Sequence, residues 1–356
     1  GSSALIDAIN AHRAITFSLD VPSGVDADSG DVPGAAVSAD ATLQFIAPHC
    51  GLFTGAALDH CGRKTVASLD VECNTNAVCA RALEQPALGH WLKPRPLDSH
   101  KGKYGHVLCV GGELGHGGAI ALCADAALRC GAGLVSVATR SAHIAALLAR
   151  RPETMVAGVE QPEQLSALIE HADVIAVGPG LGTQAWGRAL WDVAIDCGKP
   201  LVLDADALNL LATSSRQLPA QTVLTPHPGE AARLLDTSTQ AVQANRFAAA
   251  AALVERFKCS VVLKGAGTII AAPGRVACVI DAGNPGMAVG GMGDLLTGVI
   301  AALRAQGLDG FDAACCGALL HSLAGDRAAE AGGQRGLLPT DLLAPLRELS
   351  NPPRAS

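Results

Sequence analysis

The strongest chemical signature in this sequence is a glycine-rich loop that runs directly into a carboxylate. The loop contains Gly290, Gly291 and Gly293, and Asp294 follows at once. Apolar residues between 295 and 303 recur at the spacing of one helix face, and backbone amides at a helix start can hold an anion. We therefore predict that the loop binds a phosphoryl group in transfer, and that Asp294 takes a proton from the attacking hydroxyl. The alternative is that Asp294 only caps the helix.

Two further turns have the composition of phosphate-binding sites. Gly178–Gly182 follows the apolar run 174–177, and its glycines would let the backbone approach a ligand. Lys264 ends the run 260–263 and is followed by Gly265, and a lysine beside glycines suits a phosphate. The spacing of a Walker A motif is absent, so the chain is not a P-loop NTPase.

Acidic and imidazole groups follow two other apolar runs. Asp204 and Asp206 come after the run 201–203, where paired acids could hold magnesium, although Asp206 could instead cap the helix that follows. His227 stands between two prolines in a stiff, extended turn, which favours contact with a ligand over burial in the core. Because the carboxyl ends of parallel strands meet at one edge of a sheet, we expect these groups to converge there.

The elements that must position these groups alternate regularly beyond residue 100. Short β-branched runs are separated by helical segments, which we place at 118–130, 185–197, 241–257, 293–305 and 312–329. This pattern predicts an α/β fold with a mostly parallel central sheet and helices on both faces.

The front of the chain has a different pattern. Segments 14–21, 41–47 and 64–71 are expected to form short strands of an incomplete sheet. The proline-rich segment 85–99 places a boundary at about residue 90. We therefore expect a smaller, partial α/β domain with its linker over residues 1–90, and the main domain over residues 91–356.

Composition excludes several classes of protein. The 356 residues are 49% hydrophobic and 17% charged, which suits a large buried core. A net charge of −7, no basic stripe and 3% aromatic residues argue against a nucleic-acid partner. We found no signal peptide and no apolar run of membrane-spanning length, so we expect a cytoplasmic protein without a membrane partner. The pairs His49-Cys50 and His60-Cys61 lack zinc-site spacing, and the cysteines are expected to be reduced and free of transition metal.

The combination of a Gly-Gly-x-Gly-Asp loop with alternating βα units resembles the ribokinase-like superfamily, in which this Asp is the catalytic base. A closer resemblance is to the ADP/ATP-dependent NAD(P)H-hydrate dehydratases, and it covers the chain from residue 92 to 350. The motifs that carry it occur in the same order, namely His100-Lys101-Gly102, Gly118-Ala119, Gly131-Ala132-Gly133, Gly178–Gly182, Asp204–Leu208, Thr225–Glu230, Leu263–Gly265 and Gly283–Gly298.

The resemblance implies a repair reaction, in which ADP or ATP with Mg²⁺ drives dehydration of the S epimer of NADHX or NADPHX to NADH or NADPH. It implies Asp294 as the catalytic residue. It places Ala119, Gly180, His227 and Asp294 at the hydrated nicotinamide nucleotide. It also implies an adenine-nucleotide site formed by Lys264, Gly265, Ala266, Gly267, Thr268, Asn284, Pro285, Gly286, Met287, Ala288, Val289, Gly290, Gly291, Met292 and Gly293.

Residues 1–75 resemble the end of an NAD(P)HX epimerase domain, through Asp20–Asp26, Ala39–Thr42 and Gly51-Leu52. The resemblance implies that Asp20 contacts substrate and that Ser23 contributes to a potassium site. The epimerase family's upstream Gly/Asn-rich nucleotide loop is missing, and His49 replaces a commonly basic lysine. We therefore expect this segment to pack against the rest or to pair with another chain, without epimerase activity.

Two other functions compete with the dehydratase. A small-molecule kinase of the hydroxymethylpyrimidine or sugar type would share the base and the glycine-rich loop but release a stable phosphorylated product. A non-enzymatic nucleotide-binding regulator would not need Asp294. The His227 turn and the segment His100–Gly102 favour the dehydratase, and we expect a homo-oligomer.

Overall fold

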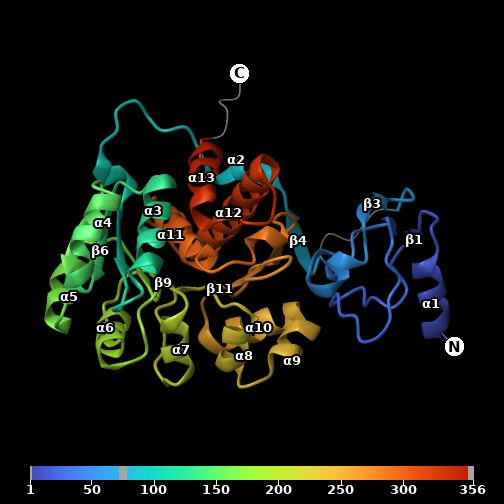
Figure 1. Ribbon diagram of the computed structural model, residues 1–356, viewed down its shortest axis with the longest axis horizontal. Helices are drawn as coiled ribbons and strands as arrows, with labels where there is room; N and C mark the ends of the chain where they lie inside the picture. The colour runs from blue at the N-terminus through green and yellow to red at the C-terminus, as the bar shows by residue number, and fades with distance from the viewer. Residues whose placement is uncertain (1, 72–77, 352–356) are drawn as a thin grey trace.

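The computed structural model describes residues 2–71 and 78–351. Its main feature is a ten-stranded sheet (Figure 1). The strands, in spatial order, are β4 (Ala80–Leu83), β13 (Ala277–Ile280), β12 (Ile269–Ala271), β11 (Ser260–Leu263), β10 (Val223–Leu224), β9 (Leu201–Leu203), β8 (Val174–Val177), β5 (His106–Val110), β6 (Leu134–Thr139) and β7 (Met155–Gly158). All neighbouring pairs are parallel except those that β12 makes with β11 and β13. The expected mostly parallel sheet is confirmed.

The sheet is buried on both faces, because successive side chains of its strands enter two different cores. In β5, Val107 and Cys109 point to one core and Leu108 and Val110 to the other. The first core is covered by α2 (Leu88–Trp91), α3 (Gly117–Arg129), α4 (Ile144–Arg150), α11 (Met292–Ala305), α12 (Gly310–Gly332) and α13 (Leu343–Leu349). The second is covered by α5 (Pro162–Glu170), α6 (Ala185–Ile195), α7 (Asp206–Ala212), α8 (Pro228–Leu235), α9 (Thr239–Ala244) and α10 (Arg246–Phe257). No helix within the described ranges has the length and apolar character to cross a membrane.

One expected helix is divided in two. The segment 241–257 is split into α9 and α10, because Asn245 adopts a non-helical conformation and its side chain accepts a hydrogen bond from the amide of Ala248. Asparagine in this position is a strong helix start. The division sets the beginning of α10 at Arg246, which lies beside the loop after β11.

The front segment forms its own three-stranded parallel sheet beside α1 (Ser2–Ala11). Its strands are β1 (Phe17–Leu19), β2 (Ala41–Phe45) and β3 (Arg63–Ala67). All three expected strands exist but are shorter than predicted. Left-handed backbone conformations at Asp20, Ile46 and Leu69 explain why the chain leaves each strand early.

The change from one sheet to the other occurs earlier than the expected boundary near residue 90. Strand β4 pairs with β13 and therefore belongs to the main sheet, and Leu88 of α2 is buried in its core. The proline-rich segment 93–99 is exposed and leads from α2 to β5. The proline-rich composition therefore marks an exposed connection within the part of the chain that forms the ten-stranded sheet.

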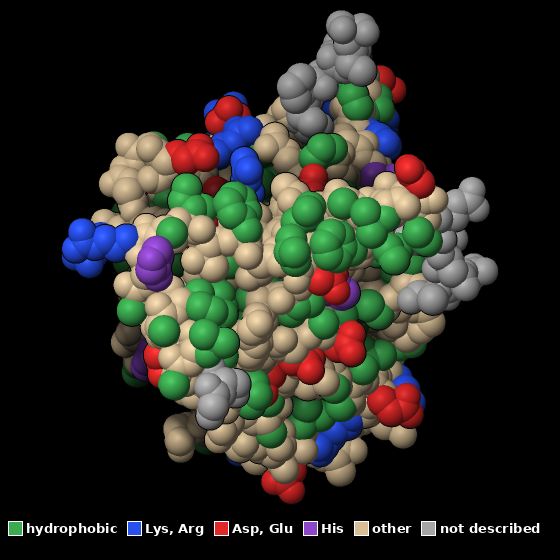
Figure 2. All heavy atoms as spheres, turned by 90° about the vertical axis from the view of Figure 1, so that its right-hand side faces the viewer, with side chains coloured by type: hydrophobic (Ala, Val, Ile, Leu, Met, Phe, Trp, Pro, Cys, Tyr) green, Lys and Arg blue, Asp and Glu red, His purple; other side chains and the backbone are tan. Residues whose placement is uncertain are grey.

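The front segment presents apolar side chains to solvent on one side (Figure 2). Ile15, Phe17 and Leu19 are 71%, 68% and 66% exposed. Its other side packs against the main sheet through two 3₁₀ helices, η1 (Cys50–Phe53) and η2 (Gly55–Asp59), whose buried residues Leu52, Phe53 and Ala57 share the second core. The segment therefore packs against the rest of the chain, as expected.

Candidate functional site

The loops that follow β5, β8, β9, β10 and β11 meet at the carboxyl edge of the main sheet. The amide of Gly112, after β5, donates to the carbonyl of Pro179 after β8, at 3.0 Å. The amide of Gly182 donates to the carboxylate of Asp206 at 2.9 Å. The amide of Lys264 donates to the carbonyl of Pro226 at 2.9 Å. The structure thus brings together the turns that the sequence placed at this edge.

A buried ion pair lies at the centre of this edge. Nζ of Lys264 is 2.5 Å from Oδ1 of Asp204 and 3.8 Å from Oε2 of Glu230. The hydroxyl of Thr297 donates to Oδ2 of Asp204 at 2.8 Å. Burial opposes the lysine's charge, but Asp204 and Glu230 outweigh it and raise the pKa of Lys264. Lys264 is therefore a fixed cation held by two carboxylates within the site.

Asp294 lies in the first turn of α11, close to this pair. Burial, followed by repulsion from Asp204 and Asp206, raises its pKa to about 7, although Lys264 acts in the opposite direction. The N-cap position is Gly291, and no side-chain capping bond is formed. The capping alternative for Asp294 is therefore wrong. A mostly buried carboxylate with a pKa near neutrality is suited to take up and release a proton.

The start of α11 touches the ion pair directly, and Gly293 makes this possible. A Cβ atom at Gly293 would lie 3.1 Å from Nζ of Lys264 and 3.4 Å from Oδ2 of Asp204. A side chain at this position would force the charged groups of Lys264 and Asp204 to shift. The glycine therefore keeps Asp294, Lys264 and Asp204 in one cluster.

Asp206 holds a neighbouring loop and caps no helix. Ala205 has an unusual positive φ of 48° and is itself the N-cap of α7, without a side-chain cap. This backbone turn separates the two acids. Asp204 reaches Lys264, while the carboxylate of Asp206 accepts from Gly182 and from Nδ2 of Asn209. The capping alternative for Asp206 is therefore also wrong.

His227 is fixed by the helix that it begins. Its Nδ1 accepts from the amides of Gly229 and Glu230, which makes it the N-cap of α8. Its Nε2 is 3.4 Å from Oε1 of Glu230, and half of the side chain is exposed. Burial and the nearby Lys264 lower the pKa of His227. The imidazole therefore caps α8 through Nδ1 and faces Glu230 through Nε2.

The expected substrate residues are only partly brought together. A Cβ atom at Gly180 would lie 3.2 Å from Cβ of Ala119, so these two residues line one spot beside the cluster. Asp20 instead follows β1 in the front sheet, where its carboxylate accepts from the amide of Phe45 and pairs with His49 at 2.8 Å. These hydrogen bonds, the one with His49 first, lower the pKa of Asp20. Ser23 is an exposed residue of the same front segment.

The loop before α11 is held by a residue that sequence reasoning missed. Asp326 of α12 accepts hydrogen bonds from the amide of Gly283 and from Nδ2 of Asn284, at 2.8 and 2.9 Å. Asn284 in turn accepts from the amide of Gly286. Residues 288–290 remain exposed. A polar residue inside a long helix gives no sequence signal for such a contact.

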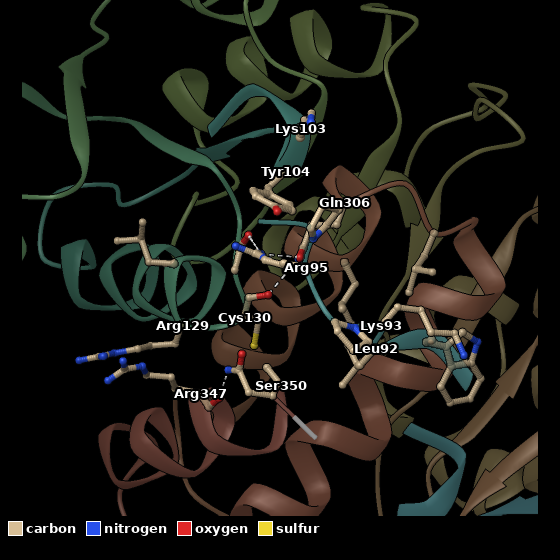
Figure 3. A pocket seen from close by; sticks show the side chains of 18 residues that line it. Leu92, Lys93, Arg95, Lys103, Tyr104, Arg129, Cys130, Gln306, Arg347 and Ser350 are labelled. Carbon is tan, nitrogen blue, oxygen red and sulfur yellow. Dashed lines mark hydrogen bonds between the residues drawn. The ribbon is translucent and has the colours of Figure 1, made fainter. Parts of the chain in front are cut away.

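A separate cavity of about 770 Å³ lies at the other edge of the sheet (Figure 3). It is bordered by the segment 91–96 and by the ends of α3 and α11, including Arg129 and Gln306. Arg95 crosses it and donates to the carbonyl of Gly131 and to Oε1 of Gln306. Its lining shares no residue with the cluster around Asp294, so it is distinct from the candidate site.

A mostly parallel sheet with a glycine-rich helix start and a partly buried aspartate at its carboxyl edge defines a ribokinase-like enzyme. Residues 107–347 match the NAD(P)H-hydrate dehydratase family, and residues 2–51 match the family described as YjeF-related protein N-terminus. The chain is 48% identical to a bifunctional NAD(P)H-hydrate repair enzyme of Coxiella burnetii, covering 98% of this chain and 72% of that protein. For the Escherichia coli enzyme of the same description, identity is 46% over 98% of this chain and 68% of that protein.

Solved structures agree. An ADP/ATP-dependent NAD(P)H-hydrate dehydratase from Bacillus subtilis, co-crystallised with ATP/Mg²⁺, superposes with a TM-score of 0.69 at 28% identity, covering 76% of this chain and 97% of that one. A ribokinase-like protein from Enterococcus faecalis gives a TM-score of 0.72 at 33% identity, covering 78% and 98%. The chain belongs to the NAD(P)H-hydrate dehydratase family.

Proposed function

We propose that this chain dehydrates the S epimer of NADHX or NADPHX, using ADP or ATP, and thereby restores NADH or NADPH. The observation that carries the proposal is Asp294, a partly buried carboxylate with a pKa of about 7 at a glycine-rich helix start. The family membership supplies the substrate class. A dehydration of this kind needs a base beside a phosphate-binding loop. Asp294 is the proposed base, and the glycine-rich loop before α11 is the proposed phosphate-binding loop.

In the proposed reaction, Asp294 accepts the proton of the hydroxyl on C6. The oxygen of that hydroxyl attacks the terminal phosphorus of the nucleotide at the same time. The new O–P bond forms as the bond to the leaving AMP or ADP breaks. The C6–O bond then breaks, and phosphate leaves with its electron pair as the ring nitrogen pushes electrons toward C6. Loss of a proton from C5 completes the double bond. Phosphorylation is needed because hydroxide is a poor leaving group.

The remaining residues of the cluster orient the two ligands. Lys264–Thr268 and Asn284–Gly293 would hold the adenine nucleotide, and Ala119, Gly180 and His227 would contact the hydrated nicotinamide nucleotide. Support comes from Gly293, where a Cβ atom would lie 3.1 Å from Nζ of Lys264, so that the two expected nucleotide segments lie next to each other. Asp20 and Ser23 lie in the front segment after β1, where we propose a potassium site.

Magnesium fits this site only together with the nucleotide. Among the described residues, no group of three or more His, Cys, Asp or Glu side chains could hold a metal ion. Asp204 is already bound to Lys264, and Asp206 to Gly182. Mg²⁺ commonly keeps several waters and is held by substrate phosphates with few protein ligands. When bound it would neutralise charge on the transferring phosphoryl group.

The direct test is to incubate the purified chain with S-NADHX, ADP and Mg²⁺, and to measure NADH and phosphate together. Equal amounts of both are expected. A small-molecule kinase would instead accumulate a stable phosphorylated product, and a regulator would bind nucleotide without turnover. Gel filtration tests the proposed homo-oligomer, and cell fractionation tests the proposed cytoplasmic location.

The pH dependence of the reaction should reveal the raised pKa of Asp294. The base works only when deprotonated, so kcat/KM should fall as the pH decreases through about 7. Glu230, whose pKa burial also raises to about 7, could steepen the decline. The measurement is kcat/KM from pH 5.5 to 9, with stability followed in parallel. A flat profile down to pH 5 would contradict the assignment of Asp294 as base.

We also predict that the front segment does not interconvert the R and S epimers of NADHX. The motivation is that Asp20 already pairs with His49 and that its sheet leaves an apolar side exposed (Figure 2). The measurement is chromatography of pure R-NADHX after incubation with the chain but without nucleotide. An epimer mixture that forms faster than in buffer would prove the prediction wrong.

A further inference from the structure

Arg246, the first residue of α10, is a buried cation without an acidic partner among the described residues. Its side chain is fully inaccessible to solvent. Nη2 donates to the carbonyls of Leu263 and Lys264 at 3.3 and 3.2 Å, and Nη1 donates to Gln243. A buried guanidinium without a carboxylate is costly and is retained only where its hydrogen bonds are well satisfied. Here those bonds converge on the loop after β11.

A further donor of Arg246 reaches across to the front segment. Its Nε donates to Oγ1 of Thr54 at 2.8 Å, and Thr54 is also fully buried. The Thr54 hydroxyl in turn donates to the carbonyl of Gly267 at 2.8 Å. The amide of Gly55 donates to the carbonyl of Ala266 at 3.1 Å. Two parts of the chain distant in sequence therefore hold the same short loop.

These contacts bind carbonyl groups of the loop, while the amides of its exposed residues Gly265 and Ala266 stay available. The carbonyls of Lys264, Ala266 and Gly267 all accept hydrogen bonds from the partners named above. The amides of Gly265, Ala266 and Gly267 have no hydrogen-bond acceptor within residues 2–71 and 78–351. Successive free amides form a concave group that binds phosphate oxygens.

The approach is too close for any residue but glycine at the contact point. A Cβ atom at Gly267 would lie 1.9 Å from the carbonyl oxygen of Phe53, and Gly267 has a φ of 63°. At Gly265 a Cβ atom would lie 3.0 Å from Nη1 of Arg246. The front segment therefore fits closely against this loop and shapes it.

We propose that Arg246 and Thr54 are positioning residues that hold the loop 264–268 with its amides turned toward the adenine nucleotide. The inference rests on the proposed function, and it makes the front segment a part of the dehydratase's nucleotide site. It assigns the front segment a role independent of epimerisation. Arg246 acts through the loop and does not itself contact the reacting atoms.

The test removes the hydroxyl of Thr54 and compares the effect with that of removing another buried threonine hydroxyl in the same segment. Thr54→Val deletes the bond to Arg246 with almost no change in volume, whereas Thr54→Ser keeps it. Thr42→Val is the control, because Thr42 is equally buried in the same segment, but its hydroxyl donates to the carbonyl of Cys61, which also lies in the front segment. KM for ADP, KM for NADHX, kcat and the melting temperature are measured for all four proteins, including wild type.

For Thr54→Val we expect KM for ADP to rise about tenfold, because a hydrogen bond to a charged, buried group is lost. KM for NADHX should stay within twofold, and Thr54→Ser and Thr42→Val should keep the wild-type KM for ADP. An equal rise of KM for ADP in Thr42→Val, or none in Thr54→Val, would overturn the inference. Calorimetry with ADP repeats the comparison without turnover. If the wild type binds ADP but is inactive, the proposed reaction is refuted. If ADP binding is then weakened only in Thr54→Val, the positioning role of Arg246 and Thr54 still holds.

Discussion

Asp294→Asn should lower the turnover of NADHX by about 10²–10⁴-fold, because a positioned general base is removed while the surrounding site is kept. This corresponds to about 3–5 kcal/mol of activation free energy. Binding of ADP should be unchanged or tighter, since a carboxylate beside phosphates is lost. The measurements are steady-state kinetics and calorimetry with ADP on both proteins.

The same substitution should leave the fold intact or stabilise it. Burial and two neighbouring carboxylates raise the pKa of Asp294 from 3.8 to about 7, so the charged form is disfavoured in the folded protein. Ionisation of Asp294 therefore lowers the free energy of unfolding as the pH rises from about 4 to 7. The Asn variant should have a melting temperature at or above that of wild type at pH 8. Asp312→Asn is the matched control, because Asp312 has the same position in the first turn of α12 but pairs with Arg275. Comparable losses of turnover in both variants, or turnover of Asp294→Asn within a few-fold of wild type, would refute the role as base.

The fold and the position of the site could be predicted from the sequence, because both depend on repeating local patterns. Buried strands of a parallel sheet are continuous apolar runs, and the residues after them lie at one edge by topology alone. This rule alone predicts that Gly178–Gly182, Asp204, His227 and Lys264 lie close together, and the contacts between their loops agree with it. Strand β4 escaped detection because its four residues are partly exposed and lack an apolar run.

The direction of each side chain could not be predicted, since it depends on contacts between distant parts of the chain. The pattern could not say that Lys264 pairs with Asp204, which is 60 residues away. Arg246 begins a helix like many solvated arginines, and only the packing of Thr54 against it shows that it is buried. Sequence predicted the chemistry of the edge, and the structure determines which groups neutralise one another.

Lys264→Met should destabilise the protein by about 3–5 kcal/mol at pH 8, the cost expected when a buried ion pair loses one partner. The variant keeps the volume of the side chain but leaves Asp204 and Glu230, 2% and 5% exposed, without their cation. In wild type, burial raises the pKa of Asp204, but Lys264 outweighs it and keeps that pKa below 3.8. Without Lys264, the pKa of both carboxyls should rise in the folded variant. The measurement is urea unfolding of both proteins at pH 8.

The sign of the pH dependence and a rescue variant make this prediction specific. When folded carboxyls have a pKa above their unfolded values, stability is fully present in acid and is lost as the pH rises through the folded pKa. The deficit of Lys264→Met should therefore be smaller at pH 5 than at pH 8. Adding Asp204→Asn removes the unpaired charge and should recover most of the loss, since a neutral amide can still accept from Thr297. A deficit that is independent of pH, or a double variant less stable than Lys264→Met, would mean that Lys264 stabilises the edge by packing and not by its charge.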